Sequence, residues 1–161
     1  SDTDCTLASN SIPNHNFNDM SASFASVVTA IDRSFSLARS PQLAATATAL
    51  SQQSYDAVML NGVVLDLLSA GCYKPSEPMA DANGNVPIGC NANADDWLLD
   101  PLAETNQFGT DAHNAHTQPD GTYHYHGNPI ALFDDFPGPE GSPVIGFAAG
   151  WFPRLRQLFL R

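Results

Sequence analysis

The sequence predicts a mainly β fold: a single-domain β-sandwich or partly open barrel with one short helix and long loops. Three observations carry this prediction. The chain has 161 residues and is 43% hydrophobic, enough for one sizeable core but cramped for two domains. Only 14% of the residues are charged, whereas glycine and proline are frequent, with 11 and 12 residues. Finally, two turn motifs stand in places that predict β-hairpins.

The first strand in the core is expected over residues 27–37. Apolar side chains partly alternate with polar ones in this segment, at Val27, Ile31, Phe35 and Leu37. Such alternation is typical of a strand that buries one face. An amphipathic helix is the alternative for the same residues.

The clearest local structure is a core hairpin over residues 55–67. Its two arms, residues 55–60 and 63–67, are rich in apolar and β-branched side chains, and Asn61 and Gly62 stand between them. A type I′ turn requires a positive φ at both of its central residues, and asparagine and glycine tolerate this conformation. We therefore expect a type I′ turn here.

The hairpin is followed by a predicted long loop, residues 69–93, that leads into the one short helix. We expect this helix at residues 95–99, because acidic residues stand near its start. Pro101 would stop it, since proline cannot continue a helix.

Three cysteines allow one disulfide and leave one thiol over. Cys72 and Cys90 flank a turn-rich loop, where a bridge is plausible in an oxidising compartment. Cys5 could equally pair with either of them or stay free near the terminus.

The charge of the chain excludes some classes of partner. Seventeen acidic against six basic side chains give a formal net charge of −11. Such a surface repels nucleic acids and anionic membranes, and no apolar run approaches the ~20 residues that span a bilayer. The short acidic start at Ser1 fits a mature exported chain, so we expect a secreted or periplasmic protein. An arbitrary boundary of the chain is the alternative.

Four of the five histidines fall within fourteen residues, from position 113 to position 126. The middle of this segment, residues 118–122, is Gln-Pro-Asp-Gly-Thr. Proline and aspartate suit the centre of a type I turn, and Gly121 suits the left-handed position after it. The pattern predicts a three-residue hairpin loop in which Gln118 faces Thr122.

This register places three histidines on one face of the hairpin. His116 lies opposite His124, and His126 follows on the same face, while Tyr123 and Tyr125 point to the other face. Three neutral imidazole nitrogens at this spacing can occupy adjacent corners of a metal polyhedron and leave a position open for water or substrate. All-nitrogen ligation suits zinc or copper, so we expect one of these metals here.

Other interpretations of the cluster remain open. His113 has the wrong parity for the triad unless a bend at Asn114 turns it inward. A pair of histidines oriented by Asp111 or Asp120 could instead act in acid and base catalysis. An open metal position is compatible with hydrolytic or redox chemistry and equally with binding alone, so no catalytic residue is assigned.

The main alternative is a non-catalytic exported recognition module. Histidine and tyrosine side chains can bind a carbohydrate, another small molecule or a protein surface by stacking and hydrogen bonds. A module of this kind would keep its affinity in a chelator, whereas a metal protein would lose stability or activity. Strand order and oligomeric state lie beyond the sequence.

The histidine segment resembles the signature of the YHYH family, a set of exported proteins named for the Tyr-His-Tyr-His tetrapeptide at residues 123–126. The resemblance also covers residues 11–15, 60–63 and 142–149. It implies export and a mostly β fold, and it makes His15 part of the family pattern. His113 and His15 are therefore included as further metal-ligand candidates.

The chain departs from the family pattern after Ala149. The family usually continues with Asp-Gly-Phe-Pro, an aliphatic residue and Tyr-Gly, whereas residues 150–156 are Gly-Trp-Phe-Pro-Arg-Leu-Arg. One extra G in the coding sequence would produce this change. We therefore divide the chain into a YHYH-like domain, residues 1–149, and an atypical tail, residues 150–161, with a genuine basic tail as the alternative to a frame shift.

Overall fold

The structure is a computed structural model that describes residues 2–17, 19–47, 49–73, 97–103, 109–132, 139, 143–150 and 153–155. Within these residues the fold is mainly β, with one 3-10 turn, η1, at Ile130–Leu132 and no α-helix. The strands are β1 (Asp4–Ser9), β2 (Arg33–Ala38), β3 (Ala57–Met59), β4 (Val64–Leu65), β5 (Ala70–Tyr73), β6 (Trp97–Leu99), β7 (Ala115–Thr117), β8 (Tyr123–Tyr125), β9 (Val144–Ala148) and β10 (Pro153–Leu155). None of the described segments forms a helix long and apolar enough to span a membrane.

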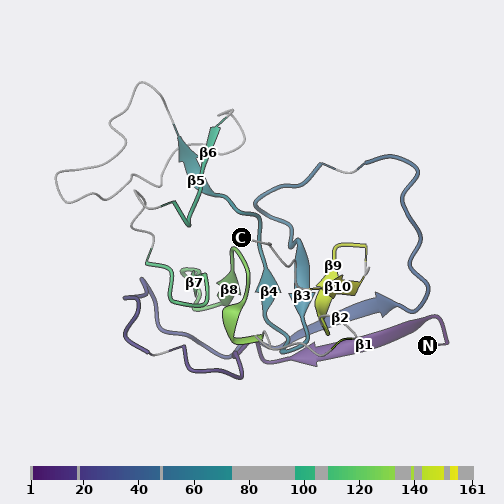
Figure 1. Ribbon diagram of the computed structural model, residues 1–161, viewed down its shortest axis with the longest axis horizontal. Helices are drawn as coiled ribbons and strands as arrows, with labels where there is room; N and C mark the ends of the chain where they lie inside the picture. The colour runs from purple at the N-terminus through teal and green to yellow at the C-terminus, as the bar shows by residue number, and fades with distance from the viewer. Residues whose placement is uncertain are drawn as a thin grey trace.

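The largest element is a six-stranded sheet in the order β10-β9-β3-β4-β8-β7. Its neighbours are antiparallel except β4 and β8, which run parallel with Val64 beside His124. β1 and β2 form a separate antiparallel ribbon, and β5 and β6 form another (Figure 1). Because the edge strands β7 and β10 are not neighbours, the sheet does not close into a barrel. The predicted mainly β class is confirmed.

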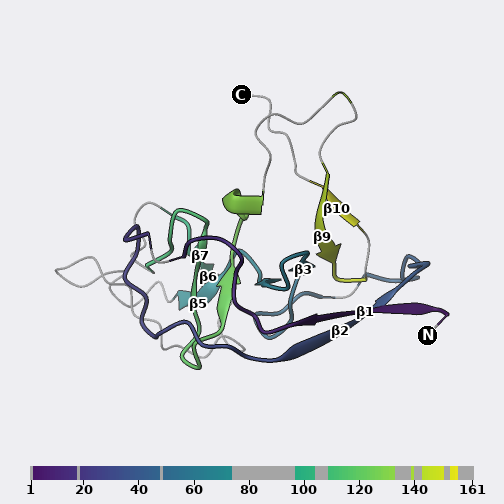
Figure 2. The same ribbon diagram turned by 90° about the horizontal axis from the view of Figure 1, so that it is seen from below.

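One face of the sheet carries the hydrophobic core. Tyr123 and Tyr125 are fully buried at its centre. The other buried members come from β3, the β3–β4 hairpin, β7 and β9: Ala57, Met59, Val63, Leu65, Ala115 and Ile145. Phe17, Phe24 and Val28, from the chain between β1 and β2, pack against this cluster. Figure 2 shows that connecting segment running across this side of the molecule.

The β3–β4 hairpin forms where the sequence predicts it, but its turn differs. Met59 N–H donates to Val63 O at 2.8 Å, which leaves a three-residue loop. Gly62 has a φ of 81°, whereas Asn61 is not in the left-handed region. The expected type I′ turn is therefore wrong: this is a three-residue loop with a left-handed glycine at its last position. The Asn-Gly pair is compatible with both loops, so it could not choose between them.

The β7–β8 hairpin matches its prediction residue by residue. His116 pairs with His124 and Thr117 pairs with Tyr123. Gln118 N–H donates to Thr122 O at 2.9 Å, which closes the loop. Gly121 has a φ of 87°, and a Cβ there would lie 2.5 Å from the Thr29 hydroxyl oxygen, so only glycine fits.

The strand expected over residues 27–37 is shorter than predicted. β2 begins only at Arg33, and residues 27–32 belong to no strand. Their backbone groups bond elsewhere instead: Thr29 N–H donates to Gly121 O, and Ile31 N–H donates to Asn10 O, both at 2.9 Å. Partial alternation could not reveal that tertiary contacts hold this segment. The alternative helix does not form.

The helix expected at residues 95–99 is wrong where the structure describes it. Trp97–Leu99 is strand β6, paired antiparallel with β5, and residues 95–96 lie outside the described residues. Three apolar residues fit a strand as well as a helix turn, so the pairing with β5 determines that this segment is a strand.

Two further predictions fall partly outside the described residues. Cys5 is a free, exposed thiol, but Cys90 and the side chain of Cys72 are not described, so that pair stays a prediction. In the tail, β10 pairs with β9 and so extends the sheet beyond Ala149. The division of the chain at Ala149 also stays a prediction.

Candidate metal centre

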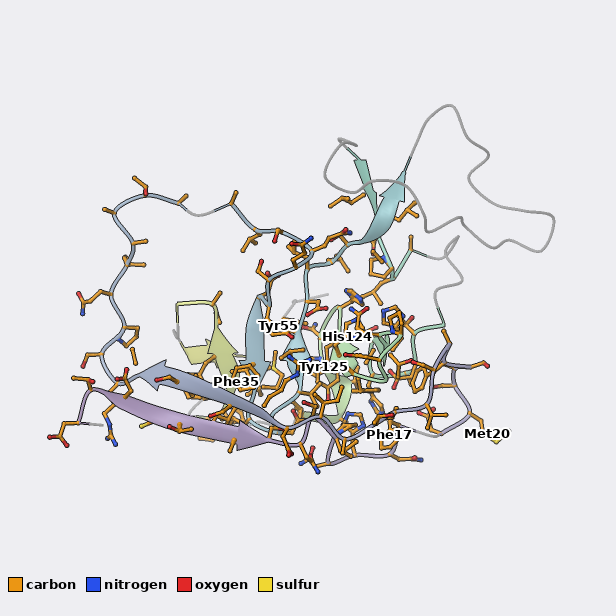
Figure 3. The ribbon with its side chains drawn as sticks, turned by 180° about the vertical axis from the view of Figure 1, so that it is seen from behind. Phe17, Met20, Phe35, Tyr55, His124 and Tyr125 are labelled. Atoms are coloured by element: carbon orange, nitrogen blue, oxygen red, sulfur yellow. The ribbon has the colours of Figure 1, made fainter. Side chains whose placement is uncertain are left out.

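Three histidines of the β7–β8 hairpin converge on the face of the sheet opposite the tyrosines. Alternation along β8 sends His124 to one face and its neighbour Tyr125 to the other (Figure 3). His116 joins the cluster from β7, directly opposite His124, and His126 follows β8. His124 and His126 are buried, with 0% and 5% of their surface exposed, and His116 is half-buried.

The three imidazoles meet through their Nε2 atoms. Nε2 of His126 lies 3.0 Å from that of His124 and 3.1 Å from that of His116. One ligand atom from each of the three falls within 4.8 Å of those of the other two. Two nitrogens bound to one tetrahedral zinc at about 2.0–2.1 Å lie roughly 3.3 Å apart. Two of the three nitrogen pairs thus have nearly the spacing of ligands around a single ion.

Backbone carbonyls set the protonation of two of these rings. Nδ1 of His126 donates to Leu67 O at 2.6 Å, and Nδ1 of His124 donates to Thr122 O at 3.2 Å. Because a carbonyl oxygen can only accept, the proton of each neutral ring is on Nδ1. The Nε2 atoms that face each other therefore both carry a lone pair and no proton, the arrangement usual for metal-ligating histidines, and the Gln118 amide lies 3.4 Å from that of His124.

Burial keeps these rings neutral. Desolvation, and then the neighbouring rings of His116 and His126, lower the pKa of His124 to about 3. Desolvation lowers the pKa of His126 to about 4. Both rings are therefore neutral at pH 7, and a metal would not have to displace a proton from either.

Asp66 is the carboxylate beside the triad, and sequence reasoning missed it. Its Oδ2 lies 3.7 Å from Nε2 of His124 and accepts a hydrogen bond from the Gln118 amide at 3.5 Å. Its Oδ1 is buried and has no hydrogen-bond partner among the described residues. Burial is the main cause that raises the pKa of Asp66 to about 6. Asp66 directly follows β4, and the parallel pairing of β4 with β8 brings it beside His124. No local sequence motif signals such a contact between distant segments.

Two cavities adjoin the triad. The larger, about 520 Å³, is lined by His116 and His126 together with residues of the 66–70 segment. The other, about 370 Å³, is lined by His124 and Arg33 among others. Asp66 lines both. Each histidine of the triad therefore lines one of the two cavities.

The structure places His15 and His113 with the tyrosines. Nε2 of His15 lies 2.7 Å from the Tyr125 hydroxyl, and the His15 and His113 rings stack with centroids 4.2 Å apart. Asn114 does form a bend, with a φ of 60°, but Nε2 of His113 bonds the carbonyl of Asn16 at 3.1 Å. Three of the five candidate histidines are therefore brought together, and these two are not among them.

The two aspartates considered as orienting groups have other partners. Asp111 accepts the Tyr123 hydroxyl proton at 2.6 Å, on the core side of the hairpin. Asp120 accepts the backbone N–H of Thr122 at 2.9 Å within the hairpin loop. Nothing in these bonds points to a histidine pair oriented by either carboxylate.

Comparison with known proteins finds one family. The sequence model for YHYH protein matches residues 34–158, which is most of the chain. The match includes both hairpins and continues past Ala149, whereas His15 precedes it. No curated protein and no solved structure matches the chain.

Proposed function

The chain belongs to the YHYH protein family, and from this premise we propose that it binds zinc or copper through Nε2 of His116, His124 and His126. The buried triad could hold one metal ion. We also propose a secreted or periplasmic location, which the resemblance to exported proteins supports.

The observation that carries the proposal is a pair of unprotonated nitrogens that face each other. Nε2 of His124 and Nε2 of His126 face each other at 3.0 Å, while both Nδ1 atoms are committed to backbone carbonyls. Two lone pairs at this distance repel, and the Gln118 amide, 3.4 Å from Nε2 of His124, makes only a long hydrogen bond that does not separate them. One cation between the rings would convert this repulsion into bonding.

The ligand atoms favour zinc or copper over harder ions. Imidazole nitrogens suit zinc and copper, whereas calcium and magnesium take oxygen ligands. With three protein ligands, a position stays open toward the adjacent cavity of about 520 Å³. This geometry supports binding of a further small ligand and is compatible with hydrolytic or redox chemistry.

The test is elemental analysis of the full chain, purified without an affinity tag or added metal. We expect about one zinc or copper per chain. The double variant His124→Ala, His126→Ala should lose this metal. Because a metal that binds only the folded state stabilises it, chelator should also lower the Tm of the wild type and leave that of the variant unchanged.

The matched control is the double variant His15→Ala, His113→Ala, which removes two imidazoles from the opposite face. It should retain the metal. A wild type that holds no metal, and takes up neither zinc nor copper in a titration, would overturn the proposal. That result would favour the recognition module.

A further inference from the structure

A second polar site lies beside the triad, in the cavity of about 370 Å³. Its wall includes His124, Asp66, Arg33 and Tyr55. Asp66 and Gln118 line both this cavity and the larger one, so the two meet at the same carboxylate. A small ligand in the smaller cavity would therefore lie next to the histidine cluster.

Arg33 is the positive charge of this cavity. It is the first residue of β2, and its side chain is half-buried. One Nη atom donates to the Tyr55 hydroxyl, and the other donates to the Thr122 hydroxyl at 3.4 Å. The guanidinium carbon also lies 5.2 Å from the centre of the Tyr55 ring. Two neutral groups thus hold the guanidinium in place.

The hydrogen bonds of Arg33 are incomplete. Its Nε atom is buried and has no partner among the described residues. Among the described residues, no carboxylate lies within ion-pair distance of the guanidinium, although the whole chain carries a formal net charge of −11. A guanidinium presents its donors as a planar fork that matches the oxygens of a carboxylate or phosphate. The described residues supply no such oxygens.

The two carboxylates of the cavity do not fill this role. Asp66 bonds Gln118 and lies 3.7 Å from Nε2 of His124. Asp120 accepts the N–H of Thr122 within its own turn. The negative charges of Asp66 and Asp120 offset that of Arg33 in the cavity, but neither carboxylate accepts a hydrogen bond from Nε–H of Arg33.

We propose that this cavity binds the oxyanion, carboxylate or phosphate, of a small molecule, with Arg33 as the residue that selects the charge. The rest of the molecule would extend past Asp66 toward the histidines. The inference rests on the proposed function for its metal, since a divalent ion at the triad makes the cavity net positive and strengthens anion binding.

The experiment is calorimetric titration of the full chain with inorganic phosphate and with succinate, in zinc-loaded and chelator-treated protein. At least one probe should bind, and more tightly to the loaded protein. Arg33→Gln should weaken binding about tenfold or more, because charge-assisted hydrogen bonds are lost. The anion affinity of Arg33→Lys should lie between those of the wild type and Arg33→Gln, since lysine keeps the charge and loses the planar fork of donors.

Arg39→Gln is the matched control. Arg39 directly follows β2 and is exposed, so its removal changes the net charge equally without touching the cavity. The affinity of the Arg39→Gln variant for the anion should stay within about twofold of that of the wild type. Equal weakening by Arg33→Gln and Arg39→Gln would overturn the inference, as would a wild type that binds neither probe.

Two further readouts separate misfolding and metal loss from loss of the anion site. In the wild type, the Nε–H resonance of Arg33 should move when the anion is added. The Arg33→Gln variant should keep its metal content and its cooperative thermal transition. A wild type that takes up neither zinc nor copper, but whose anion binding depends on Arg33, would refute the proposed metal function and retain the anion site. A zinc-loaded protein that binds neither probe would refute the anion site and retain the proposed metal function.

Discussion

The two faces of the β7–β8 hairpin carry polar networks of different kinds. On the core face, Asn61 donates to the Tyr125 hydroxyl at 3.1 Å, and this hydroxyl donates to Nε2 of His15 at 2.7 Å. The other ring nitrogen of His15 then donates to Asn16 O at 3.2 Å. In this series each N–H or O–H donor has a protein acceptor. On this face, Nδ1 of the neighbouring His113 is the buried atom that lacks a partner among the described residues.

On the opposite face, acceptors meet acceptors. The carbonyls of Thr122 and Leu67 accept hydrogen bonds from Nδ1–H of His124 and His126, so the unprotonated Nε2 atoms face each other at 3.0 Å. The Gln118 amide reaches Nε2 of His124 only at 3.4 Å. Donors matched with acceptors stabilise the fold, whereas two lone pairs directed at each other are where we propose that a metal binds. Both faces carry histidines beside aromatic or polar groups, so the direction of their hydrogen bonds, and not residue content, distinguishes the candidate metal site.

The largest expected effect is acid destabilisation of the metal-free protein. The folded-state pKa of His126 is about 4 and that of His124 about 3, both below the ordinary 6.5. Between these values and 6.5 the unfolded chain binds more protons, so stability is full above pH 6.5 and falls as the pH drops toward 4. Each ring contributes up to about 1.4 kcal/mol per pH unit.

Urea denaturation in chelator, from pH 7.5 to 4.5, measures this dependence. In the control variant, His124→Gln with His126→Gln, the titrating groups are gone, so most of the slope should disappear. If variant and wild type lose stability equally over this range, the triad is not held neutral by burial and the contrast between the faces fails.

The second effect tests the core face. Tyr123→Phe removes the hydroxyl that donates to Oδ2 of the buried Asp111 at 2.6 Å. Because this carboxylate oxygen then lacks its donor, we expect a loss of about 2–3 kcal/mol in urea denaturation. Metal content should be unchanged. A variant of wild-type stability that had lost its metal would reverse the roles assigned to the two faces.

The sequence was sufficient for whatever depends on local pairing. The loop at residues 118–122 sets the register of β7 and β8, and a period of two then separates the histidines from the tyrosines. The three candidate ligands from the hairpin therefore converge as predicted. The Asn61-Gly62 dipeptide fits two loop lengths that differ by one residue, so it could not select between them.

Contacts between distant segments could not be predicted in this way. The parallel pairing of β4 with β8 joins residues about 60 positions apart, and it delivers both Asp66 and the Leu67 carbonyl to the triad. The hydrogen bond between His15 and Tyr125 likewise joins residues that are distant in the sequence. Parity excluded neither His15 nor a bent His113 from the site, so only the tertiary structure separates them from the triad.

A third and smaller effect concerns Asp66. Burial raises its folded-state pKa to about 6 from an ordinary 3.8, so in metal-free protein stability is lost as the pH rises from 3.8 through about 6. Asp66→Asn removes this buried charge and should stabilise the chelator-treated protein by about 1–2 kcal/mol at pH 7.5. Zinc affinity should change in the opposite direction, because the carboxylate lies beside the proposed cation.

The exposed Asp32 provides the control for this variant. Asp32→Asn removes the same charge from the surface, so it should change neither stability nor zinc affinity appreciably. Denaturation and zinc competition titrations on both variants make the comparison. Equal behaviour of the two would show that Asp66 does not interact with the triad.

The smallest effect comes from the outer end of the satisfied network. Tyr125→Phe removes the hydroxyl between Asn61 and His15. His15 is half-buried and Asn61 is half-buried, so water can reach both groups and replace part of the lost bonding. We expect a loss of only about 0.5–1 kcal/mol, with metal content unchanged. A larger loss than that of Tyr123→Phe would mean that His15, rather than Asp111, anchors the core face, and that the N-terminal segment is held mainly through this hydroxyl.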